Sequence, residues 1–163
     1  MPGSSVFALL TGLNTFREKF LWRSKIAWLA FTPRGVKNVD PREPLSRFIT
    51  TRRWVDWAKK KVNEKAFLPR EDGCLSTYRQ LGASSATLRR IGDLVASRAR
   101  EKTLYGTAVI MASDPPLQKL RLKRDWLSLH VDIVGWPQKS EQKAVALKLA
   151  NASVFVERGS FPR

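Results

Sequence analysis

The sequence predicts an α+β protein, with helices in its N-terminal part and a small C-terminal sheet packed with one or two helices. Two observations predict this class. Before about residue 100, apolar side chains recur mainly at spacings of three and four. After it, apolar runs alternate or are continuous and are separated by proline-containing turns. With 163 residues and 43% hydrophobic content, the chain has the size and composition of one globular domain with extensions.

We expect three segments along the chain. Residues 1–31 form an amphipathic helix, because Val6, Leu9 and Leu13 begin an apolar stripe that charged residues interrupt elsewhere. Those charges argue against a transmembrane span. Residues 32–44 contain three prolines and form an extended basic linker. Residues 45–163 form a small basic α+β domain.

Residues 45–67 show helical spacing through Leu45, Phe48, Val55 and Val62, so a helix is predicted there. Its tryptophans alternate with basic residues. Because cations neutralise phosphate and tryptophan can stack on an unpaired base, this segment is the strongest candidate for RNA contact. A role for the tryptophans in the core is the open alternative.

The stretch YRQLGASSATLRRIGDLV predicts two short helices joined at Gly82, the second capped by Ser84 or Ser85. Together with Leu68-Pro69 before it and Gly106-Thr107 after it, this order resembles the winged helix-turn-helix of GntR-type bacterial regulators. The resemblance covers about 45 residues and implies a recognition helix at 85–97, with Thr87, Arg89 and Arg90 facing DNA. Gly92 departs from the pattern, since it loosens that helix. Contact with RNA phosphate and a simple helical hairpin are the alternatives.

The last third predicts strands and one helix. Residues 103–112 are apolar on both alternations, as in a strand covered on two faces, and Asp114-Pro115-Pro116 ends it. Residues 126–134 alternate as a half-buried strand. A helix is expected from Ser140 through Ala150, and a closing strand at 153–157.

Charge indicates the class of partner. The chain carries 30 Lys and Arg against 14 Asp and Glu, a net charge of +16 spread along its whole length, which favours an extended polyanion. A soluble basic domain with no such partner is the plain alternative. The predicted nucleic-acid-binding residues are Arg52, Arg53, Trp54, Trp57, Lys59, Lys60, Lys61, Arg89, Arg90, Lys119, Arg121, Lys123 and Arg124.

We predict no catalytic residue, metal site, cofactor or small-molecule substrate. Cys74 and His130 are each the only residue of their type, which excludes an intramolecular disulfide and zinc sites built on several such ligands. Ser128, His130 and Asp132 share one face of a predicted strand. Because side chains two apart on a strand lie parallel, we do not expect them to form a catalytic triad.

The expected function is that of a non-enzymatic structural component of a large ribonucleoprotein, specifically a mitochondrial ribosomal protein in the matrix that contacts rRNA and neighbouring subunits. The first alternative is a winged-helix DNA-binding protein. The second is an accessory subunit of an inner-membrane respiratory complex, whose N-terminal helix lies on the membrane surface. Outside mitochondria, the lone cysteine favours a reducing compartment. The sequence leaves open the assembly, the choice between RNA and DNA, and whether residues 1–31 are a retained targeting segment.

Overall fold

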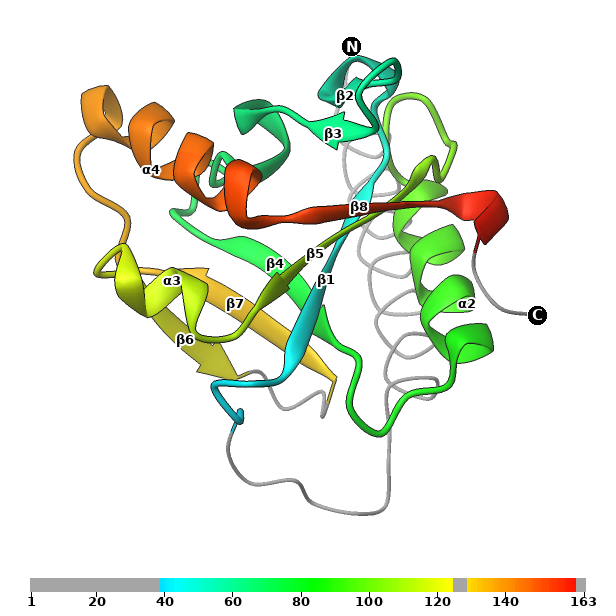
Figure 1. Cartoon of the computed structure of the whole chain (residues 1–163), viewed down its shortest axis with the longest axis horizontal. Coiled ribbons are helices and arrows are strands. Elements are labelled where there is room, and N and C mark those ends of the chain that lie inside the picture. Colours follow the sequence, from blue (N-terminus) through cyan, green and yellow to red (C-terminus); the bar gives the residue numbers. More distant parts are fainter. Residues whose placement is uncertain (1–38, 125–128, 161–163) are drawn as a thin grey trace, which may run out of the picture.

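The computed structural model describes residues 39–124 and 129–160, which form a mixed α+β fold around a six-stranded antiparallel sheet (Figure 1). The strand order is β6-β7-β4-β1-β5-β8. These strands are β1 (Pro44–Ile49), β4 (Leu75–Arg79), β5 (Gly106–Met111), β6 (Arg121–Arg124), β7 (His130–Val134) and β8 (Val154–Glu157). A separate hairpin pairs β2 (Val55–Asp56) with β3 (Lys61–Val62).

Helices cover both faces of the sheet. One face packs against α4 (Lys139–Ala152) and the short 3₁₀ helix η2 (Glu64–Phe67), and its core includes Leu45, Phe67 and Ile133. The other face packs against α2 (Ser85–Ala96), with Phe48 and Tyr78 in its core. The remaining helical turns are α3 (Asp114–Leu117), η1 (Arg52–Trp54) and η3 (Arg158–Ser160).

The helix predicted at 85–97 is confirmed as α2. The Ser84 hydroxyl accepts a hydrogen bond from Thr87 N at 3.1 Å and caps the helix. Leu88 and Ile91 are buried beneath it. Gly92 permits close packing, because a Cβ there would lie only 2.8 Å from Leu104 and 3.0 Å from Phe48. The glycine that seemed to loosen the helix therefore lets it approach the sheet.

The helix predicted at 45–67 is wrong, and so is the short helix predicted directly before Gly82. The first segment forms β1, η1, the β2–β3 hairpin and η2, and the second forms β4. Both β1 and β4 are central strands with buried side chains on both alternations. A strand covered on two faces loses its period of two, so its apolar residues can match helical spacing by chance.

This correction also removes the helix-turn-helix. The element before α2 is a strand, so the implied two-helix motif is not formed. Gly106 does not lead a wing either, since it begins β5 beside β8. A Cβ on Gly106 would collide with the carbonyl oxygen of Val156. Close pairing of β5 with β8 therefore requires a glycine at this position.

Most of the elements predicted for the C-terminal part of the chain are confirmed. The predicted strands at 103–112 and 153–157 are found as β5 and β8, and α4 contains the predicted helix. β7 begins at His130, and residues 125–128 lie outside the described part of the chain. The sheet is larger than predicted, because β1 and β4 belong to it.

The N-terminal prediction at 1–31 lies outside the described residues, as does the linker up to residue 38. Within 39–124 and 129–160, no helix has the length and apolar character needed to cross a membrane.

Candidate nucleic-acid interface

One end of the molecule gathers most of the predicted RNA-contact residues. It consists of residues 52–61, which contain η1 and most of the β2–β3 hairpin, together with residues 97–103, the loop after α2 (Figure 1). We call these two segments the basic end. Glu101 joins them, because its carboxylate accepts a hydrogen bond from Arg52 N at 3.0 Å. That bond and a second one from the Tyr105 hydroxyl lower the pKa of Glu101, so the link is strongest when the carboxylate is ionised.

The basic end carries eight cationic side chains and two acids, Asp56 and Glu101. All eight cations are exposed. They are Arg52, Arg53, Lys59, Lys60, Lys61, Arg98, Arg100 and Lys102. Two of the lysines form long ion pairs: Lys59 lies 4.0 Å from Asp56 and Lys60 lies 3.9 Å from Glu157, and both lysines are about three-quarters exposed. Exposed ion pairs of this kind are weak. Because the basic end carries eight cations and two acids, it keeps a net positive charge.

The two tryptophans occupy different environments, which the helical interpretation did not predict. Trp54 is half-buried against the core cluster under α4. Trp57 is 37% exposed, and its ring meets Tyr105 and Phe155 edge-on at 6.0 and 5.9 Å. The Arg52 guanidinium lies 6.0 Å from the Trp57 ring centroid. Trp57 is thus held in place with part of its surface open beside cations.

Truncating the tryptophans should separate their roles. Trp54→Ala is expected to cost about 3 kcal/mol of unfolding free energy, the lower end for loss of a large aromatic, because the ring is half-buried. Trp57→Ala should instead weaken RNA binding by about 1–3 kcal/mol with a smaller effect on stability. Thermal melts and RNA titrations of both single variants measure this. Equal loss of stability with no binding defect for Trp57→Ala would contradict the stacking role.

The other predicted residues lie elsewhere. Arg89 and Arg90 are exposed on α2. Lys119, Arg121, Lys123 and Arg124 are exposed at or beside β6, an edge strand of the sheet, where charges also prevent edge-to-edge pairing. Arg98, Arg100 and Lys102 were not among the predicted binding residues, although they stand in the basic run SRAREK, because their nearness to residues 52–61 depends on the fold.

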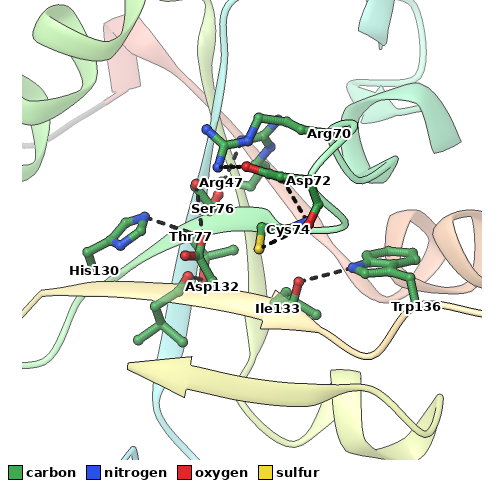
Figure 2. A network of polar contacts seen from close by, with 11 residues as sticks. Arg47, Arg70, Asp72, Cys74, Ser76, Thr77, His130, Asp132, Ile133 and Trp136 are labelled. Carbon is green, nitrogen blue, oxygen red and sulfur yellow. Dashed lines mark hydrogen bonds and ion pairs between the residues drawn. The ribbon is translucent and has the colours of Figure 1, made fainter. Parts of the chain in front are cut away.

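A second polar cluster joins β4 and β7 (Figure 2). The Ser76 hydroxyl donates to Asp132 Oδ1 at 3.0 Å, and His130 Nε2 lies 3.6 Å from the same oxygen. His130 and Asp132 thus lie close together, whereas Ser128, the third residue considered for a triad, lies outside the described residues. However, the carboxylate stands between the hydroxyl and the imidazole. A serine nucleophile needs its base next to it, so this cluster is not a Ser-His-Asp triad.

Cys74 lies beside this cluster and is not an activated thiol. Burial raises its pKa, and the carboxylates of Asp132 and Asp72 raise it further. Within the described residues, no group of three or more His, Cys, Asp or Glu side chains could hold a metal ion.

Comparison of the chain with protein-family models, with curated proteins and with solved structures found no match.

Proposed function

We propose that this chain binds RNA through its basic end, as a non-enzymatic component of a ribonucleoprotein. One observation carries the proposal: two segments that are distant in sequence are joined by the hydrogen bond between Arg52 and Glu101 and together carry eight exposed cations, and one of these, Arg52, lies 6.0 Å from the ring of the partly exposed Trp57. Lysine and arginine neutralise phosphates, and an exposed tryptophan accepts an unpaired base, which folded RNA offers in its loops.

RNA is favoured over duplex DNA for two reasons. The helix-turn-helix that suggested DNA reading is not formed, since β4 stands in place of its first helix. A tryptophan among cations suits a base that is already unstacked, whereas bases in duplex DNA are paired. Placement in a mitochondrial ribosome, with rRNA and neighbouring subunits as partners, is a finer proposal based on charge distributed along the sequence.

The salt dependence of RNA binding tests this function. Each neutralised phosphate should contribute about 0.7 to 0.9 to the slope of log affinity against log salt. If half of the eight cations contact phosphate, we expect a slope of about −3 or steeper for a stem-loop RNA. The measurement is a dissociation constant at several KCl concentrations, with duplex DNA of the same sequence as the control. A slope shallower than about −2, or equal affinity for the duplex, would argue against the proposal.

A further inference from the structure

Arg47 occupies an opening in the middle of the sheet. β1 and β4 are paired only at Leu45↔Arg79 and Ser46↔Tyr78, and beyond these pairs the strands separate (Figure 1). Gln80 directly follows β4, and its backbone N–H donates to the carbonyl oxygen of Pro44 in β1. The backbone groups of alternate residues in a strand face the same neighbouring strand, so those of Tyr78 and Ser76 also face β1. The Ser76 carbonyl therefore faces the side where β1 would have continued. Arg47 Nη1 donates to that carbonyl at 3.2 Å, and its Nε donates to Ala66 O at 3.1 Å.

This arginine lacks an acidic partner among the described residues, unlike Arg79 in the neighbouring strand β4. Arg79 is fully buried and is held by Glu43 through bonds of 2.8 and 2.7 Å. Arg47 is half-buried and bonds only to carbonyl oxygens. Burial lowers its pKa to about 10, and the charge of Arg70 also lowers it. The protein thus compensates one guanidinium with a carboxylate and leaves the other without one.

The acids close to Arg47 are already engaged. Asp72 Oδ2 pairs with Arg70 Nη2 at 2.9 Å, and its Oδ1 accepts Cys74 N at 3.0 Å. Asp132 is engaged by Ser76 and His130. In Figure 2, the Arg70 side chain reaches toward Arg47 on the same side of β4, and the two charges interact. Of these two guanidinium groups only that of Arg70 is paired with a carboxylate, which leaves an excess positive charge.

From this geometry we infer that Arg47 and Arg70 form a binding site for one phosphate group, separate from the basic end. A tetrahedral oxyanion can accept hydrogen bonds from two planar guanidinium forks at once. The phosphate would give the Arg47 guanidinium a negatively charged partner, and it would compete with Asp72 for the guanidinium of Arg70. The group is either free phosphate or the terminal phosphate of an RNA, which share this chemistry.

Two substitutions with opposite expected effects test the site. Arg70→Gln removes one fork and should weaken binding of inorganic phosphate roughly ten- to a hundredfold. Asp72→Asn keeps an oxygen for Cys74 N but removes the competing charge, so it should strengthen binding. Isothermal titration calorimetry of the full chain with inorganic phosphate, at a constant ionic strength set by chloride, measures the affinity of both variants. These variants alter an exposed loop, so the test does not depend on Arg47 variants folding.

Arg158→Gln is the matched control. Arg158 Nη2 pairs with Asp93 Oδ1 at 3.0 Å, so this change removes the same charge from a similar pair. It should leave phosphate affinity within about twofold of wild type. Absence of phosphate binding, the same direction of change for Arg70→Gln and Asp72→Asn, or an equal loss in Arg158→Gln would overturn the site.

A comparison of two RNAs identifies the source of the phosphate. If it is a terminal phosphate, a 5′-phosphorylated oligonucleotide should bind more tightly than its 5′-hydroxyl form, and Arg70→Gln should abolish that difference. If it is free phosphate, the two RNAs should bind alike while inorganic phosphate still binds wild type. Either result supports the site, and failure of the basic end to bind RNA would leave the inorganic phosphate measurement unaffected.

Discussion

Glu43→Gln is expected to lower the free energy of unfolding by about 3–5 kcal/mol, because it leaves Arg79 charged and buried without its partner. The side chains of Arg79 and Glu43 are 1% and 0% exposed, and they share two hydrogen bonds. Glu43 directly precedes β1 and Arg79 ends β4, so the pair joins two central strands at the point where they still hydrogen-bond. Because both side chains are buried, solvent cannot reach the guanidinium to replace the lost carboxylate charge.

Chemical denaturation of the full chain measures this effect. Glu157→Gln is the control, since it removes an exposed pair with Lys60 and should cost at most about 1 kcal/mol. Replacing both buried partners, with Glu43→Leu and Arg79→Met, should recover much of the loss because no charge is left unpaired. A Glu43→Gln variant within about 1 kcal/mol of wild type would show that the pair does not hold the strands together.

Local signals predicted the elements that are defined by neighbours in sequence. The serine cap and the stripe through Leu88 and Ile91 predicted α2, and alternation predicted the strand found as β7. These features depend on residues a few positions apart. β1 and β4 were misassigned because burial on both faces erased the alternation that identifies a strand.

The sites depended on contacts that local patterns do not encode. Charge composition indicated a polyanion partner, and five of the predicted cations do lie together at the basic end. The loop at 97–103 joins them only because Glu101 reaches Arg52, 49 positions away. Likewise, nothing near Arg47 in the sequence shows that β1 and β4 separate beside it, or that its guanidinium reaches the Ser76 carbonyl.

Replacing Lys59, Lys60 and Lys61 together by glutamine (K59Q/K60Q/K61Q) is expected to weaken binding of a stem-loop RNA roughly a hundredfold at 0.1 M salt. The three lysines lie at the turn and second strand of the hairpin, all are exposed, and their ion pairs are long. Lys60 also adopts a left-handed backbone conformation, with φ of 49°, that favours glycine or asparagine at turns. Because these side chains pack little, the folded domain should keep its melting temperature.

The matched control removes the same charge from a different surface. Lys139, Lys143 and Lys148 are exposed on α4. The K139Q/K143Q/K148Q variant has the same net charge as the hairpin variant, so any general loss of attraction is equal in the two. It should bind RNA almost as wild type does.

The salt dependence of RNA affinity, compared between these two triple variants, tests the basic end most directly. If the hairpin lysines contact phosphates, K59Q/K60Q/K61Q should make the slope of log affinity against log salt shallower by about 2 to 3, while K139Q/K143Q/K148Q leaves it unchanged. Equal slopes for the two variants would show that RNA is held by overall charge or by another surface, and would contradict the assignment of the basic end as the interface.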